Sequence, residues 1–192
     1  MLFRKDAPQR RDNIVEKKNY RDYRIPLRED FNCRCGYCND RDIPRVEYFE
    51  IDHLVPQKIM KKKKDNDYNN LVYACHSCNN AKRAKWPSCD ENIPIVGEKG
   101  WIDPCLEDYA KQFERDDSGR IIPTTPIGKW MYDNLKLDKP QHQVLWSLEQ
   151  LELLSDALEQ KIEGDIDNLK LYKQFFLLTK KIKEWSKKIY QQ

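Results

Sequence analysis

The 192-residue sequence lacks the features that mark membrane and secreted proteins. No stretch approaches the ~20 apolar residues that a membrane-spanning helix needs, so we expect no membrane association. Residues 1–6 contain no apolar run typical of a secretion signal, which favours a cytoplasmic protein. The seven cysteines are an odd number, and this argues against a framework of disulfides. No internal repeat or low-complexity segment is found.

Four of the seven cysteines form two Cys-x-x-Cys pairs. Each pair can present two thiolates to one side of a metal ion, and two pairs complete the tetrahedron that structural zinc prefers. His76 and Cys33 lie close enough in sequence to be rival ligands. We therefore expect one structural Zn²⁺, held by Cys35, Cys38, Cys75 and Cys78.

Positive charge is concentrated in residues 55–85. This segment holds eight basic and two acidic residues, a net charge of +6 in a chain whose total is +3. Such a concentration is typical of proteins that contact a phosphate backbone. For residues 61–64 a solvated loop is the alternative interpretation. The candidate nucleic-acid contacts are Lys58, Lys61, Lys62, Lys63, Lys64, Lys82, Arg83 and Lys85.

Between and after the cysteine pairs, the pattern predicts a strand, a loop, a second strand and a short helix. An alternating run leads into Asp52 and His53, and residues 69–74 are expected to return as a strand. The helix is expected at residues 79–85 and should end at Trp86-Pro87. Neighbours in a regular strand point to opposite sides. We therefore expect the backbone to loop at Asp52 and His53 if both side chains serve one site.

The order of these motifs over residues 33–87 resembles the zinc-bearing HNH endonucleases. The matching elements are Cys-x-x-Cys, Asp-His-x-x-Pro, Asn-Leu and Cys-x-x-Cys-Asn-x-x-Lys. The resemblance implies an α+β fold with a ββα-metal core stapled by the four-cysteine zinc site. It also implies that Asp52 and Asn79 hold one catalytic Mg²⁺ or Mn²⁺ and that His53 is the general base. Asn70 resembles the residue that braces the histidine loop, and Lys82 matches a lysine for which we expect a phosphate contact.

The implied activity is hydrolysis of DNA phosphodiester bonds, with RNA left open as a substrate. This reaction needs a deprotonated water, a cation on the phosphate and stabilisation of the departing alkoxide. A histidine that is largely neutral at pH 7 suits the first task, and oxygen ligands suit a hard divalent ion. One alternative is a sequence-specific restriction or homing-type nuclease. Another is a non-catalytic, zinc-stapled adaptor that binds nucleic acid.

We divide the chain into four parts on the basis of these patterns. The first part, residues 1–30, is expected to be either an arm that follows nucleic acid or a solvated terminus. The third part, residues 88–141, should contain a β-hairpin and a short helix at 128–137. The strands of the hairpin are expected at residues 111–115 and 120–124, on either side of a Gly-containing turn. The parts are a basic N-terminal segment (1–30), the HNH core (31–87), an accessory region (88–141) and a helical hairpin (142–192).

The last part has the periodicity of two helices. Apolar residues recur at spacings of three and four up to residue 162, Gly164 breaks the run, and Asp165 is a candidate N-cap. Residues 149–167 hold seven acids and one lysine, and residues 170–188 hold seven lysines and one glutamate. An antiparallel hairpin should place these opposite charges side by side, although each exposed pair contributes only ~0–1 kcal/mol.

Two partner classes follow for these helices. They are candidates for self-association or for docking to another protein, and the alternative is that they complete the hydrophobic core. Residues 108–137 resemble the tail of bacterial HNH proteins found with anti-phage ATPases and retrons. That resemblance implies an effector of anti-phage defence and a defence-system ATPase as a partner.

Overall fold

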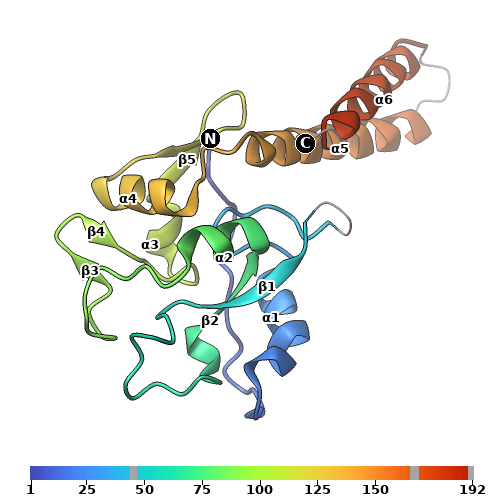
Figure 1. The fold of residues 1–192 in the computed structure, drawn as a ribbon. Helices are drawn as coiled ribbons and strands as arrows, with labels where there is room; N and C mark the ends of the chain where they lie inside the picture. Colours follow the sequence, from blue (N-terminus) through green and yellow to red (C-terminus); the bar gives the residue numbers. More distant parts are fainter. Residues whose placement is uncertain (44–46, 165–168, 190–192) are drawn as a thin grey trace.

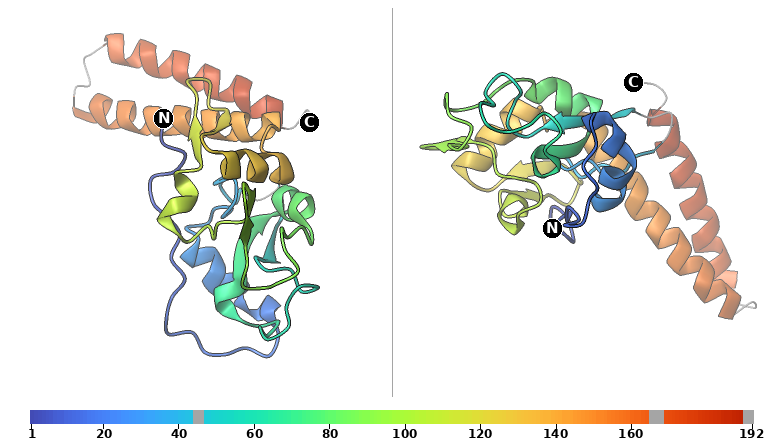
Figure 2. Two further views of the ribbon diagram at one scale, coloured as in Figure 1. Left: turned by 90° about the vertical axis from the view of Figure 1, so that its left-hand side faces the viewer. Right: turned by 90° about the horizontal axis from the view of Figure 1, so that it is seen from below.

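The computed structural model describes residues 1–43, 47–164 and 169–189. It has an α+β body from which a long helical hairpin projects (Figure 1; Figure 2). The α+β class expected from the sequence is confirmed. Within the described ranges the strands pair into three separate two-stranded antiparallel sheets. These are β1 (Phe49–His53) with β2 (Leu71–Cys75), β3 (Ile95–Val96) with β4 (Lys99–Gly100), and β5 (Phe113–Arg115) with β6 (Ile121–Pro123).

The β1–β2 hairpin and α2 (His76–Lys82) form the ββα unit (Figure 1). All of β2 is buried, because α2 covers one face and α1 (Arg24–Asp30) packs against the strand from the other side. The helix α2 starts directly after Cys75, three residues earlier than expected, because the Cys75 sulfur caps the amide of Cys78. It ends at Lys82, because the next residue, Arg83, has a φ of 49°, and it does not extend to Pro87.

Shorter elements frame this unit. The 3₁₀ helices η1 (Tyr20–Tyr23) and η2 (Tyr68–Asn70) precede α1 and β2, and α3 (Glu107–Ala110) precedes β5. The predicted β5–β6 hairpin is present, and its turn needs Gly119, whose φ is 89° and which packs against Trp146. The short helix expected from residue 128 is α4 (Pro126–Leu135), which starts earlier because Thr125 caps it.

The N-terminal segment is anchored to the rest of the protein at two of its arginines, whereas Lys5 and residues 15–19 are exposed. Arg4 is 6% exposed and donates to the Pro104 carbonyl at 2.9 Å. Arg10 pairs with Asp103 at 2.8 Å and also donates to a β2 carbonyl. These guanidinium groups are therefore committed to the protein's own body.

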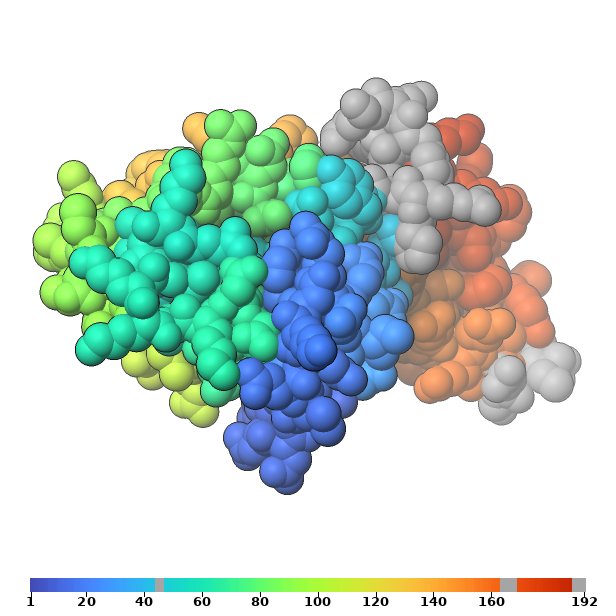
Figure 3. Space-filling model, turned by 60° about the horizontal axis from the view of Figure 1, so that its bottom comes forward, coloured from blue at the N-terminus to red at the C-terminus, as the bar shows by residue number. Residues whose placement is uncertain are grey.

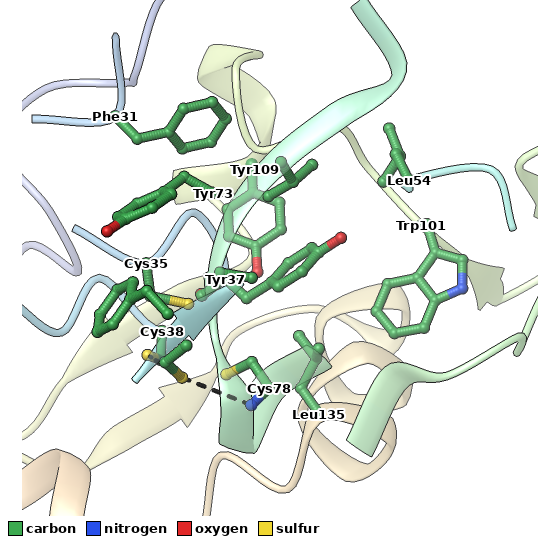
Figure 4. Close-up of a cluster of buried hydrophobic side chains, with 14 of the residues drawn as sticks. Phe31, Cys35, Tyr37, Cys38, Leu54, Tyr73, Cys78, Trp101, Tyr109 and Leu135 are labelled. Carbon is green, nitrogen blue, oxygen red and sulfur yellow. Dashed lines mark hydrogen bonds between the residues drawn. The ribbon is translucent and has the colours of Figure 1, made fainter. Parts of the chain in front are cut away.

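One buried cluster joins the first three parts of the chain. It contains Phe3 from the N-terminal segment, Tyr37 beside the cysteines, Trp101 and Tyr109 from the accessory region, and Leu135 from α4. Figure 4 shows the rings of Tyr37 and Tyr109 beside Cys35 and Cys38, and the Tyr109 hydroxyl donates to the Tyr37 carbonyl at 2.9 Å. The four-part division remains a prediction, and this core crosses two of its boundaries.

The C-terminal helices α5 (Pro140–Gly164) and α6 (Leu169–Ile189) pack along each other and extend away from the body (Figure 2). In the described part of α5, the residues buried against the body lie at its start and are His142, Val144, Leu145 and Leu148. The proposed N-cap Asp165 lies outside the described residues. No helix in the described ranges is long and apolar enough to cross a membrane.

Candidate active site

The four cysteines of the two Cys-x-x-Cys pairs converge on one buried point. Their sulfur atoms all lie within 4.8 Å of one another, and the sulfurs of Cys38 and Cys75 are 3.8 Å apart. A tetrahedral zinc with Zn–S bonds of ~2.3 Å sets its sulfurs ~3.8 Å apart. A disulfide would require ~2.05 Å. The cluster therefore fits zinc.

The four cysteines are buried, so their thiolate forms would require a cation beside them. The residue exposure of all four cysteines is 1% or less. Burial, together with the neighbouring thiols, raises the pKa of Cys38 well above that of a free thiol. Several thiolates cannot be held together in such surroundings without a positive ion among them. Cys33 is free and half-buried, and it lies outside this group of four.

Asp52 lies inside the protein, on the face of β1 that α2 covers. Its Oδ2 accepts a hydrogen bond from the Tyr37 hydroxyl at 2.5 Å and pairs with the Lys82 ammonium at 2.9 Å. Burial, and then the Asp52 charge, raises the pKa of Tyr37 well above its usual value, so the hydroxyl stays protonated and donates. The Lys82 side chain is 0% exposed and also donates to the His53 carbonyl at 2.7 Å. The phosphate contact expected of Lys82 does not fit this geometry.

His53 lies on the opposite face of β1 from Asp52. The strand stays regular through this residue, which pairs with Leu71, so the expected loop in the backbone is absent at this point. Its Nε2 is 2.8 Å from the Asp65 carbonyl, and its ring packs edge-on against Tyr20 at 4.7 Å. A carbonyl can only accept, so Nε2 carries the proton and the lone pair is on Nδ1. The ring is thus oriented with a basic nitrogen away from its anchor.

Asn70 fixes the backbone that follows His53. Its side-chain oxygen accepts from the Val55 amide at 2.9 Å, and its side-chain nitrogen donates to the Val55 carbonyl at 3.1 Å. In addition, the amide of Leu54 donates to the Asn70 carbonyl at 2.8 Å. These three bonds hold the first residues after β1 in one position, which is the geometry that a brace requires.

Asn79 does not contact Asp52 directly. Its amide nitrogen lies 2.8 Å from Oε2 of Glu50, and Nδ1 of His76 lies 3.1 Å from the same oxygen. Glu50 and Asp52 are two residues apart in β1 and therefore share the face that α2 covers. The structure thus brings Asn79 to that face, but next to a carboxylate that the sequence interpretation overlooked.

The expected phosphate-binding residues differ in how accessible they are. Lys63 and Lys85 are half-buried, and Lys85 donates to the Asn134 carbonyl at 3.1 Å. The Glu91 carboxylate accepts hydrogen bonds from the backbone amides of Lys61 at 2.7 Å and Lys62 at 3.2 Å. These bonds fix the loop of residues 61–64, which we call the basic loop. In Figure 3 this loop (teal) lies beside the N-terminal segment (blue) on one face. The exposed members of the set are Lys58, Lys61, Lys62, Lys64 and Arg83.

A second buried cluster ties α5 to the zinc loop, residues 35–40. Nδ1 of His142 is 2.6 Å from the Asp40 carboxylate, and Arg115 donates to the Cys38 carbonyl at 3.3 Å. Burial lowers the pKa of His142, but Asp40 outweighs it and raises that pKa above its ordinary value. Because Cys38 belongs to the zinc set, this cluster supports the zinc loop from behind.

The comparison with known families agrees with this geometry. Residues 35–85 match the family model described as HNH endonuclease. The chain contains an HNH endonuclease domain. The matched segment begins at the first cysteine of the zinc set and includes β1, β2 and α2. No curated protein shows significant sequence similarity to the chain.

The HNH domain supports a nuclease-type function and a nucleic-acid substrate. Sequence reasoning missed Tyr37, Glu50 and the Asp65 carbonyl. Glu50 carries a usable signal, because it precedes Asp52 by two residues in a predicted strand and must share its face. Tyr37 and Asp65 carry no such signal, since their partners depend on how distant segments pack.

Proposed function

We propose that the chain is a metal-dependent endonuclease that hydrolyses DNA phosphodiester bonds with His53 as the general base. The observation that carries this proposal is the anchoring of Nε2 on the Asp65 carbonyl, which leaves the Nδ1 lone pair for a proton. Asn70 holds the adjoining backbone through Val55. An imidazole held in this way at the end of β1 is suited to deprotonating a water molecule. Because His53 and Asp52 leave the strand on opposite faces, the scissile phosphate would have to lie across the end of β1 to reach both the base and the ion.

In this mechanism the water oxygen attacks phosphorus while its proton passes to His53 Nδ1. The P–O bond to the leaving strand breaks, and the leaving oxygen departs with the bonding electron pair and takes a proton from solvent water. A divalent ion, Mg²⁺ or Mn²⁺, supplies when bound a positive charge on the phosphate and on that leaving oxygen. Asp52 and Asn79 are the proposed ligands, with Asp52 offering the oxygen that Lys82 and Tyr37 do not engage. Lys58, Lys61 and Lys62 hold the backbone electrostatically.

The test is nicking of a supercoiled plasmid in Mg²⁺ or Mn²⁺, with His53→Ala as the paired variant. Loss of the base should slow cleavage by roughly 10²–10⁴-fold. DNA affinity, measured in parallel, should change little. An RNA substrate of matched length decides between the two nucleic acids. Cleavage by the variant at the wild-type rate would leave the non-catalytic adaptor as the better description.

The projecting hairpin is the part of the chain that we propose for contact with a second copy. Leu153 is 57% exposed, Phe176 66% and Leu177 56%, so α5 and α6 both present large apolar side chains to solvent. In a two-fold dimer the acidic helix of one copy can face the basic helix of the other, which makes the surface self-complementary. A defence-system ATPase is the competing partner, and the resemblance of residues 108–137 supports an anti-phage role.

A further inference from the structure

Three side chains with metal-binding atoms meet outside the buried Asp52–Lys82 pair. They are Glu50 of β1 and two residues of α2, His76 and Asn79, which are three positions apart and so share one helix face. Oε2 of Glu50 lies 3.1 Å from Nδ1 of His76 and 2.8 Å from the amide nitrogen of Asn79. A carboxylate, an imidazole and a carboxamide thus surround one point.

The spacing of these atoms suits neighbouring ligands of a single ion. Two ligands at ~2.1 Å from an octahedral ion and at right angles to each other lie ~3.0 Å apart. Nitrogen and oxygen of an amide are interchanged by rotating the group, so Asn79 can present its oxygen without moving its backbone. The hydrogen bonds from Glu50 to His76 and Asn79 use the same side-chain atoms that would bind an ion.

Access and charge also favour this point over Asp52. The side chains of Glu50 and His76 are 34% and 39% exposed, whereas that of Asp52 is 8% exposed. Oδ2 of Asp52 already has a cation, the Lys82 ammonium, at 2.9 Å. A divalent ion approaching that oxygen would meet like charge, whereas Glu50 has no lysine or arginine as a recorded partner among the described residues.

We propose that Glu50 and His76 are ligands of the divalent ion and that they complete its site at Asn79. This inference rests on the proposed nuclease function and changes one part of its site, because Glu50 replaces Asp52 as the carboxylate ligand of the ion. The mixed oxygen and nitrogen set suits Mn²⁺ better than Mg²⁺, because magnesium prefers oxygen alone. Asp52, two residues along the same face of β1, stays close enough to orient water bound to the ion.

The experiment measures Mn²⁺ binding to the zinc-loaded, full-length protein by electron paramagnetic resonance, without DNA. Glu50→Gln and His76→Ala should each weaken Mn²⁺ binding at least roughly 10-fold. Changing a residue that only supports a metal ligand already costs about that much affinity, so the loss of a ligand should cost no less. His76→Ala should weaken the binding of Mn²⁺ more than the binding of Mg²⁺, which is measured by its competition with Mn²⁺. The matched control is Glu114→Gln, an exposed glutamate on β5, which should bind Mn²⁺ as the wild type does. Zinc content and melting temperature verify that each variant is folded.

The outcomes separate this inference from the nuclease proposal. Wild-type Mn²⁺ affinity in both Glu50→Gln and His76→Ala overturns the inference, and a loss only in Asp52→Asn then places the ion at Asp52. If Glu50→Gln loses Mn²⁺ but the wild type cuts neither DNA nor RNA, the metal site stands and the nuclease function fails. If Glu50→Gln cuts normally at limiting Mn²⁺, the nuclease stands and the inference fails.

Discussion

Replacing Lys82 with methionine tests whether this lysine supports the fold or contacts the substrate. Its side chain is 0% exposed, its Nζ is 2.9 Å from Asp52 Oδ2, and it donates to the His53 carbonyl at 2.7 Å. Methionine keeps the apolar stem and removes the ammonium group. Among the residues that the structure describes, Asp52 would then keep the hydroxyl of Tyr37 as its one side-chain partner. A buried carboxylate would be left without its counter-charge.

The expected loss of folding free energy follows from that geometry. Removing one partner of a buried ion pair costs about 3–5 kcal/mol, because the other charge remains desolvated. This is a large share of the ~5–15 kcal/mol that stabilises a typical domain. Lys62→Met, at an exposed lysine of the basic loop, should change stability by less than ~0.5 kcal/mol. Urea unfolding followed by tryptophan fluorescence measures both, with zinc content as a check on folding.

A double variant and a salt titration sharpen this test. Asp52→Asn combined with Lys82→Met should cost less than the sum of the two single changes, because no unpaired charge remains. In DNA binding, Lys62→Met should reduce the dependence of log K on log salt by about 0.9, the value for one phosphate contact. Lys82→Met should leave that dependence unchanged. If instead Lys82→Met is as stable as the wild type and shows the shallower salt dependence, the lysine reaches phosphate and our reasoning is wrong.

Four further predictions concern the base, the zinc, the attachment of the hairpin and its self-association. Residual cleavage by His53→Ala should rise when imidazole is added to the solution, because the added base can take the water's proton in place of the missing side chain; no recovery at any imidazole concentration would argue against a base at this position. Cys75→Ser should release zinc, seen by metal analysis, and lower the melting temperature, since zinc binding is coupled to folding in such sites; a stable zinc-free protein would contradict this. Deleting residues 153–192 should preserve the melting temperature, whereas deleting 140–192 should lower it by removing buried α5 residues; equal melting temperatures would argue against the docking. Phe176→Glu should lower the mass measured by light scattering toward that of one chain, while an unchanged dimer would exclude this face.

Much of the central unit was predictable because its residues signal their roles locally. Paired Cys-x-x-Cys motifs restrict the metal and its geometry, and an alternating run before Asp52 specifies a strand. Even the early start of α2 had a local signal. A cysteine sulfur can cap a helix, and in this chain the Cys75 sulfur accepts the Cys78 amide.

The roles of the charged residues were less predictable, because burial is set by distant packing. Lys82 is one of eight basic residues in its segment by sequence, yet its partner Asp52 lies across the β1–α2 interface. The sequence likewise suggests Arg10 as part of an arm, yet in the structure it pairs with Asp103, 93 residues away. A lysine or arginine side chain has an apolar stem, so it can be buried in a core where a carboxylate pairs with its charged end. Net charge alone therefore overestimates a nucleic-acid surface.

The position of Tyr37 indicates what the zinc contributes to the site. Tyr37 lies between the two cysteines of the first pair, and its hydroxyl orients the Asp52 carboxylate at 2.5 Å. The preceding residue, Gly36, donates its amide to the Tyr73 carbonyl of β2 at 2.8 Å. The loop is therefore bonded to both strands of the hairpin, and the four-sulfur cluster fixes where it stands. A zinc ion bound by these cysteines would act by holding the loop in place, because a displaced loop would withdraw the Tyr37 hydroxyl from Asp52.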